Sequence, residues 1–372
     1  MRILRLLGLL LLLLAAMNAS NAHARAPKAA KAQDRDVRPL IIAHRGASGY
    51  RPEHTLAAYE LGARMGADFV EPDLVSTKDG VLVARHENEI SGTTDVSERS
   101  EYADRKTTKS IDGVALTGWF TEDFTLRELK GLRAKERIPQ IRPRNTLYDG
   151  RYEVPTFQEV ISLTRRLSRE LGRPIGIYPE TKHPTYFQSI GLPLEAPLVA
   201  ALERNRLNRR TAKVFVQSFE TANLKALDPQ LAVPLVQLLD APNSVPFDVR
   251  AAGGTTTYAQ IATRAGLERV GRYAAGVGPP KTYIVPRDAA GNSLEPTSFV
   301  DDAHDAGLLV HPYTFRNENT FLPLELRRGT PPDPARYGDA FAEYEQFLGL
   351  GVDGLFSDNA DTAVEARDGV PR

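Results

Sequence analysis

The regular alternation of short apolar runs with longer segments of helical periodicity most constrains how this chain can fold. Apolar runs stand at 39–43, 69–74, 81–84, 175–178, 213–216, 233–239, 308–310 and 354–356, with a weaker run around 276–278. Segments with helical patterns lie between them, at 55–65, 156–171, 194–204, 222–227, 298–306 and 339–350. This order predicts parallel strands whose faces are covered by helices.

Local signals support this interpretation. The stretch TFQE at 156–159 is a capping box, and an apolar stripe follows it from Val160 to Leu171 and ends at Gly172. The dipeptide Asp79-Gly80 separates two apolar runs, which is a hairpin signal. The run at 81–84 is therefore expected to turn back antiparallel to 69–74.

Without that hairpin strand, eight strands remain. Eight strands that alternate with helices predict a TIM (β/α)8 barrel, an α/β fold of roughly 250 residues or more. The long polar segment at about 87–154, with one predicted helix near 126–132, is expected to be an insertion that caps the catalytic face. A second long loop, 240–257, is rich in Pro, Gly and Thr, and long loops in compact domains often act as lids.

The N-terminus has the pattern of a secretory signal peptide. Arg2 and Arg5 precede an apolar run at 6–16, and Ala22-His23-Ala24 follows it. A membrane anchor is the alternative, but the run is shorter than the about 20 residues that span a bilayer. We expect a signal peptide at 1–24, a flexible lead-in at 25–38 and one domain at 39–372.

Composition excludes several classes of protein. There is no cysteine, and 47 basic residues balance 47 acidic ones. A neutral chain gives no signal for nucleic-acid binding, and a chain without cysteine cannot carry a lipid on an N-terminal cysteine. No later stretch is apolar enough for stable membrane insertion. We therefore expect export to the periplasm, while the oligomeric state is unknown from the sequence.

Polar side chains gather at the carboxyl ends of the predicted strands and not at the amino ends. They are His44 and Arg45, Glu71 and Asp73, Glu180 and Lys182, Gln217 and Ser218, His311 and Tyr313, and Ser357 and Asp358. In a TIM barrel the carboxyl ends form the catalytic face. Six strands with this pattern predict an active site there.

Three carboxylates in this set suit a metal ion. Glu71 and Asp73 are two residues apart, so on a strand they point the same way, and Glu180 can join them from a neighbouring strand. Carboxylates this close repel one another unless a cation lies between them. All-oxygen ligands favour Ca²⁺ or Mg²⁺ over Zn²⁺. Three separate ion pairs with Arg or Lys are the structural alternative.

His44 and His86 are the candidate proton carriers, because near neutral pH one imidazole can take a proton while another gives one. The hairpin strand at 81–84 brings His86 beside the metal carboxylates. Arg45 can hold phosphate oxygens in bidentate fashion, and Lys182 adds positive charge. These groups suit phosphodiester hydrolysis, in which the attacking hydroxyl comes from water or from the substrate's own alcohol.

The stretches AHRGASGYRPEHT, EPDLVSTKDGVLVARHE and GIYPETK resemble the motifs of the glycerophosphodiester phosphodiesterases, specifically the periplasmic bacterial type. The likeness continues through VQSF, LLVHPYT and DGLFSD and covers about residues 40–363. It implies a TIM barrel with an inserted cap and one divalent cation, with Ca²⁺ preferred to Mg²⁺. The implied reaction cleaves small-molecule glycerophosphodiesters to sn-glycerol 3-phosphate and an alcohol.

The resemblance also implies residue roles. It makes His44 and His86 catalytic, Glu71, Asp73 and Glu180 metal ligands, Arg45 and Lys182 phosphate-binding, and Glu53 a polar site residue. Further candidates for the substrate-binding lining are Gln217, His311, Tyr313 and the single Trp119. The chain departs from the family at Glu87, where Asp is usual. At His54 many relatives have Asn, although the periplasmic type resembles this chain there. Glu87 leaves the orientation of His86 open.

Three other functions fit the sequence less well. A phospholipase D-like phosphodiesterase on intact lipids needs an exposed apolar or aromatic patch that the sequence does not clearly show. A non-catalytic binding protein on the same barrel predicts loss of a catalytic histidine or a metal carboxylate, and all are present. A barrel glycosidase with paired carboxylates leaves both histidines, Arg45 and Lys182 unexplained.

Overall fold

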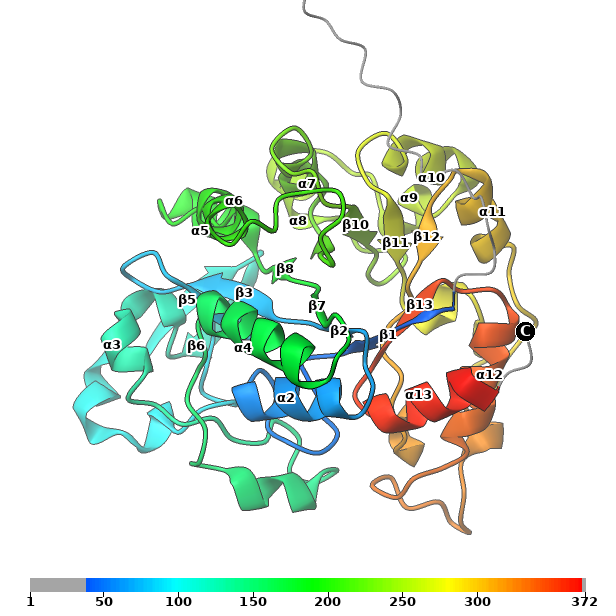
Figure 1. Cartoon of the computed structure of the whole chain (residues 1–372), viewed down its shortest axis with the longest axis horizontal. Helices are drawn as coiled ribbons and strands as arrows, with labels where there is room; N and C mark the ends of the chain where they lie inside the picture. The colour runs from blue at the N-terminus through cyan, green and yellow to red at the C-terminus, as the bar shows by residue number, and fades with distance from the viewer. Residues whose placement is uncertain (1–37, 370–372) are drawn as a thin grey trace, which may run out of the picture.

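Eight parallel strands close into a ring in the computed structural model, which describes residues 38–369 (Figure 1). They are β1 (Leu40–Ala43), β2 with β3 (Phe69–Val70 and Asp73–Ser76), β7 with β8 (Gly176–Ile177 and Glu180–Thr181), β9 (Val216–Ser218), β10 (Leu235–Leu238), β11 (Gly276–Gly278), β12 (Leu309–Val310) and β13 (Gly354–Ser357). The ring closes between β12 and β13, where Asp353 N–H donates to Val310 O and Phe356 N–H to Pro312 O, both at 3.0 Å. The predicted TIM barrel is confirmed, including its weakest strand, β11.

Two of these barrel strands are interrupted by proline. Pro72 separates β2 from β3, and Pro179 separates β7 from β8, because proline has no N–H for the ladder. The strands remain paired across the break, since Glu180 N–H donates to Pro72 O at 3.0 Å. Asp73 and Glu180 consequently become direct register partners.

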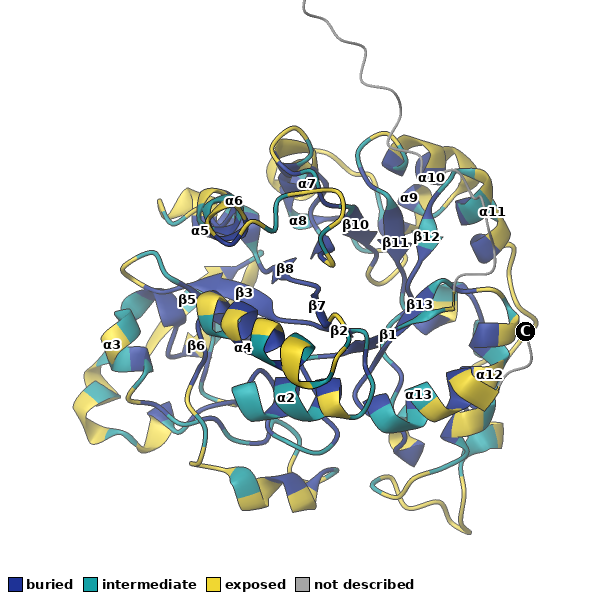
Figure 2. Cartoon of the chain, in the orientation of Figure 1, coloured by how far each residue is buried: buried dark blue, intermediate teal, exposed yellow. Residues whose placement is uncertain are grey.

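Side chains inside the barrel follow a period of two along each strand. One closed apolar cluster in the interior consists of Ile42, Phe69, Tyr178, Phe215, Val236 and Phe356. The residues two positions after each member of this cluster are, in the same order, His44, Glu71, Glu180, Gln217, Leu238 and Asp358. The interior is therefore apolar below and mostly polar at its carboxyl end. A larger apolar core separates strands from helices, whose outer faces are exposed (Figure 2).

The outer layer consists of helices, most of which the sequence predicts. They are α2 (Leu56–Arg64), α4 (Phe157–Glu170), α5 (Pro184–Ser189), α6 (Glu195–Arg204), α7 (Thr221–Leu227), α8 (Phe247–Ala251), α9 (Tyr258–Ile261), α10 (Arg264–Val270), α11 (Phe299–Asp305), α12 (Ala340–Gly349) and α13 (Ala360–Gly369). The predicted capping box is present at the start of α4, where Thr156 and Glu159 bond reciprocally. The helices α5, α8, α9, α10 and α13 are additional to the predicted set.

The segment 87–154 follows the predicted hairpin, in which β4 (Leu82–Ala84) pairs antiparallel with β3. It contains α3 (Leu126–Leu129) and an unpredicted two-stranded ribbon of β5 (Thr107–Ile111) and β6 (Val114–Gly118). The ribbon turn reaches the barrel, because Asp112 Oδ2 lies 2.6 Å from His183 Nδ1. This contact joins the insertion to the loop that follows β8.

The predicted signal peptide and nearly all of the lead-in lie outside the described residues. Within 38–369, no helix combines the length and the apolar character needed to cross a membrane.

Candidate active site

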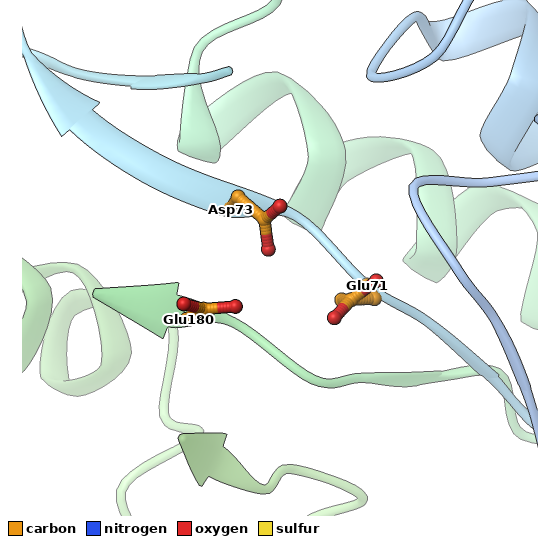
Figure 3. Close-up of side chains that lie close together, drawn as sticks. All are labelled: Glu71, Asp73 and Glu180. Carbon is orange, nitrogen blue, oxygen red and sulfur yellow. The ribbon is translucent and has the colours of Figure 1, made fainter. Parts of the chain in front are cut away.

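The three carboxylates predicted to bind a metal meet at the carboxyl end of the barrel. Asp73 on β3 pairs in register with Glu180 on β8, and Glu180 pairs with Gln217 on β9. One oxygen from each of Glu71, Asp73 and Glu180 lies within 4.8 Å of the others, and all three residues are buried. Figure 3 shows the three side chains pointing into a common space.

Burial and like charge control how these carboxylates ionise. Burial, with Asp73 and Glu180, raises the pKa of Glu71 well above its ordinary value. Burial also raises the pKa of Glu180 to about 8, although Lys182 Nζ lies 2.8 Å from its Oε1. Burial acts on Asp73 too, but Lys182 and His54 hold its pKa well below the usual range. Asp73 Oδ1 is buried and accepts no hydrogen bond from the described residues, so the donor set fits a hard cation.

Two neutral side chains orient the carboxylates. His54 Nε2 lies 3.0 Å from Asp73 Oδ2, and His54 Nδ1 lies 2.7 Å from the Tyr59 hydroxyl. Because Asp73 is ionised, we assign the donated proton to Nε2. Gln217 Nε2 donates to Glu71 Oε1 at 2.7 Å. The orienting role of His54 was not predicted from the sequence, where it appeared only as a departure from the family.

A strained turn after β1 brings Arg45 to the site. Arg45 has a φ of 59° and Gly46 a φ of 88°, a left-handed conformation that is uncommon for a non-glycine residue. Glycine is needed next, because a Cβ at Gly46 would lie 2.6 Å from the backbone of Ala58. The turn lets Arg45 N–H donate to Glu71 Oε2 at 3.0 Å and its Nη1 to Glu53 Oε2 at 3.1 Å.

His44 is held by a carboxylate of the neighbouring strand. Its Nδ1 lies 2.5 Å from Asp358 Oδ1, and the other oxygen of Asp358 accepts from Arg142 and Arg316. Burial alone would raise the pKa of Asp358, but the positive charges of these arginines outweigh that effect and hold the pKa well below its usual range. Burial and Arg45 lower the pKa of His44 to about 4. A neutral imidazole that donates from Nδ1 keeps Nε2 as a proton acceptor.

His86 is held in the same way by its neighbour in the chain. Its Nδ1 lies 2.8 Å from Glu87 Oε2, so the residue that departs from the family still orients the imidazole. Arg137 of the insertion donates to both oxygens of Glu87, at 2.6 and 2.7 Å, and also to Glu53. Burial and Arg45 lower the pKa of His86 well below its ordinary value. The sequence analysis did not single out Arg137, and it included Asp358 only among the polar residues at strand ends.

These side chains line a cavity of about 250 Å³. The predicted residues in its wall are His44, Arg45, Glu71, Asp73, His86, Glu180, Lys182, Gln217 and Tyr313. Glu53 does not line this cavity; it binds Arg45 and lines an adjoining cavity. One unpredicted residue in the wall is Arg316, which follows β12 and carries no strand-end signal of its own.

Two candidate lining residues lie elsewhere. His311 is fully buried one layer below the cavity, with Nδ1 at 2.8 Å from the Tyr178 hydroxyl and its ring against Phe215. The period of two places His311 inside the barrel, as predicted, but in its apolar interior, so the substrate-binding prediction is corrected. Trp119 is buried in the insertion, where Nε1 donates to Tyr102 O at 2.6 Å.

Comparison with known proteins agrees with this geometry. Residues 44–362 match the model of the glycerophosphoryl diester phosphodiesterase family. The chain is 38% identical over 343 residues to glycerophosphodiester phosphodiesterase GDPD6 of Arabidopsis thaliana, covering 89% of this chain and 86% of the relative. It is 30% identical over 350 residues to the glycerophosphodiester phosphodiesterase of Haemophilus influenzae, covering 89% and 90%.

Solved structures show the same fold. A phosphodiesterase of Oleispira antarctica, in complex with the product sn-glycerol-3-phosphate, has a TM-score of 0.56 at 21% identity and covers 89% of this chain and 97% of its own. A putative glycerophosphoryl diester phosphodiesterase of Silicibacter pomeroyi has a TM-score of 0.56 at 20% identity, covering 89% and 94%.

A barrel whose carboxyl end brings together two imidazoles, an arginine, a lysine and three carboxylates suits the hydrolysis of phosphodiesters. The extent of the family match and the identity to the two relatives narrow the class further. The chain belongs to the glycerophosphoryl diester phosphodiesterase family and is an enzyme of that family.

Proposed function

We propose that this enzyme hydrolyses glycerophosphodiesters to sn-glycerol 3-phosphate and an alcohol, using a divalent cation and the acid–base pair His44 and His86. The observation that carries the proposal is the convergence of both imidazoles, three buried carboxylates, Arg45 and Lys182 on one cavity. The product complex of the Oleispira antarctica phosphodiesterase supports the same class of substrate.

Glu71, Asp73 and Glu180 would hold the cation. When bound, it would neutralise charge on the non-bridging oxygens of the phosphodiester and make the phosphorus more electrophilic. We propose that the cation is Ca²⁺ rather than Mg²⁺. Ca²⁺ binds more protein oxygen ligands, which three carboxylates can supply, whereas Mg²⁺ usually keeps several of its water ligands.

The protein's own groups complete the reaction. Arg45 and Lys182 bind phosphate oxygens and stabilise the charge that develops on them. One imidazole accepts the proton of the attacking hydroxyl as its oxygen bonds to phosphorus. The other imidazole must first take up a proton at Nε2, which the negative charge of the bound phosphodiester favours. The bond from phosphorus to the alcohol oxygen breaks, and this imidazolium donates its Nε2 proton to that oxygen. Exchange with solvent restores both protonation states.

The test is release of sn-glycerol 3-phosphate from glycerophosphocholine by the purified enzyme, with Ca²⁺, with Mg²⁺ and with a chelator. We expect release with a cation and loss of release with the chelator. Folded enzyme that releases nothing with either cation would contradict the proposal.

Glu71→Ala should weaken cation binding by more than the roughly 10- to 100-fold expected when an outer hydrogen-bonding group is lost. The reason is that Glu71 supplies an oxygen directly. Calorimetric titration of Ca²⁺ into both proteins measures this, with the exposed Glu101→Gln as the matched control. An unchanged titration would remove Glu71 from the proposed ligands.

We also propose that the enzyme is exported to the periplasm, on the strength of the signal-peptide pattern at 1–24. Expression of the full chain in a bacterium, fractionation and N-terminal sequencing test this. The expected result is a periplasmic protein that begins at Arg25, and an uncleaved cytoplasmic protein would overturn the proposal.

A further inference from the structure

A second cavity of about 280 Å³ adjoins the first. The two share His44, Arg45, His86 and Arg316, but none of the three metal-binding carboxylates lines the second. The rest of its wall comes in large part from the insertion, through residues 136–138 and 142. The two cavities therefore meet at the imidazoles.

A phosphodiester carries two substituents on one phosphorus, and both must be accommodated when that phosphorus lies between the imidazoles. We propose that the glycerol phosphate part occupies the first cavity and the leaving alcohol the second, where Glu136 selects alcohols that carry an ammonium group. This inference rests on the proposed function and names the specificity element of the same site.

The arginines of the second cavity are already neutralised. Arg137 binds two carboxylates, Glu53 and Glu87. Arg142 binds Glu318 and Asp358, at 2.6 Å each. Arg45 and Arg316, which also line the cavity, pair with Glu53 and Asp358. Four arginines thus face four carboxylates, so the positive charge in this wall is compensated before any alcohol enters.

Unlike these arginines, Glu136 in the same wall forms no ion pair within the described part of the chain. Its Oε1 accepts from Ile138 N–H at 2.9 Å, and its Oε2 accepts from Asn145 Nδ2 at 2.8 Å. The residue is 5% exposed, yet it lines the cavity. A nearly buried carboxylate with two neutral donors and no counter-ion leaves a negative charge facing the alcohol.

Electrostatics and shape both favour a cationic occupant. Burial raises the pKa of Glu136, and an ammonium group in the cavity would oppose that effect by favouring the ionised carboxylate. Ile138 and Phe321 give the wall apolar surface. The Phe321 ring is already covered on one side by Arg316, 4.4 Å from its centroid. Apolar surface beside a carboxylate suits an ammonium with carbon substituents.

The test compares glycerophosphocholine, whose alcohol is cationic, with glycerophosphoglycerol, whose alcohol is uncharged. The readout is selectivity, defined as the ratio of kcat/KM for the first substrate to kcat/KM for the second. Glu136→Gln should lower selectivity about tenfold at low ionic strength, as expected for loss of one charge-assisted contact. Glu136→Lys should lower it further. The control Glu101→Gln, on the exposed surface of the same insertion, should leave selectivity as in the wild type.

A second variant tests occupancy of the cavity without altering its charge, in case Glu136 variants fold poorly. Ile138→Trp should fill the cavity and lower kcat/KM for glycerophosphocholine several-fold more than for glycerophosphomethanol, whose alcohol is a single carbon. Thermal unfolding of each variant measures its stability.

The outcomes separate the inference from the proposed function. If the wild type cleaves none of these diesters, the proposed function fails. If the wild type cleaves them, and both Glu136 variants keep its selectivity, the inference about Glu136 is overturned. If Ile138→Trp affects the large and small alcohols equally, the alcohol does not occupy the second cavity.

Discussion

The two histidines are held by different parts of the molecule. His44 follows β1, and its carboxylate Asp358 follows β13, the neighbouring barrel strand, so both ends of the contact belong to the barrel. His86 follows β4, and its carboxylate Glu87 is itself held by Arg137 of the insertion. The His44 side chain is 8% exposed and that of His86 is 32% exposed. The same pairing of an imidazole with a carboxylate is thus built once between the ends of two barrel strands and once within the loop that follows β4.

The barrel and the insertion therefore contribute differently to the two histidines. The barrel supplies the carboxylate that contacts His44, whereas the insertion supplies the arginine that holds the carboxylate of His86 and much of the wall of the second cavity. The insertion also reaches the first pair, because Arg142 donates to Asp358. Changes in the insertion that spare Arg142 can therefore alter the leaving-alcohol side of the site without altering how His44 is held.

The largest expected effect on kcat follows from replacing either histidine. His44→Ala or His86→Ala should each lower kcat by about 10³-fold, within the range for loss of a general acid or base, while the far-UV circular dichroism remains that of the wild type. Steady-state release of sn-glycerol 3-phosphate measures this. A rate near that of the wild type in either variant would exclude that histidine from the acid–base pair.

Asp358→Asn tests the barrel side of the comparison. It should lower kcat roughly 100-fold, because the imidazole loses the anion that orients it, and lower the free energy of unfolding by about 3 kcal/mol, because two arginines lose a buried partner. Kinetics and urea unfolding measure the two effects. In the double variant with His44→Ala, Asp358→Asn should add no further loss of kcat. Additive losses would show that Asp358 does not act through His44.

Glu87→Gln tests the insertion side and should have the smallest effect. We expect kcat to fall about tenfold with little change in stability, because His86 and Glu87 are partly exposed and exposed pairs contribute little. Glu87→Asp should recover part of the rate. If Glu87→Gln reduces kcat as much as Asp358→Asn does, the two histidines are held equally firmly and the comparison fails.

The barrel residues of the site were predictable because side-chain direction on a strand repeats every two residues. That rule places His44 above Ile42 and Glu71 above Phe69. The rule does not show how far along the barrel axis a side chain lies. It therefore predicted that His311 points inside the barrel, but not that His311 lies one layer below the cavity. The β5–β6 ribbon also escaped prediction, although Asp112-Gly113 at its turn is a hairpin signal of the same kind as Asp79-Gly80.

The sequence by itself determined the alternation of strands and helices, the β3–β4 hairpin, and which residues stand at the mouth of the barrel. Periodicity and turn chemistry act over a few residues, so they can be read locally. Only the tertiary structure decided which carboxylate meets which histidine. Asp358 lies 314 residues from His44, and Arg137 lies 50 residues from Glu87. Closure of the barrel and packing of the insertion bring these groups into contact.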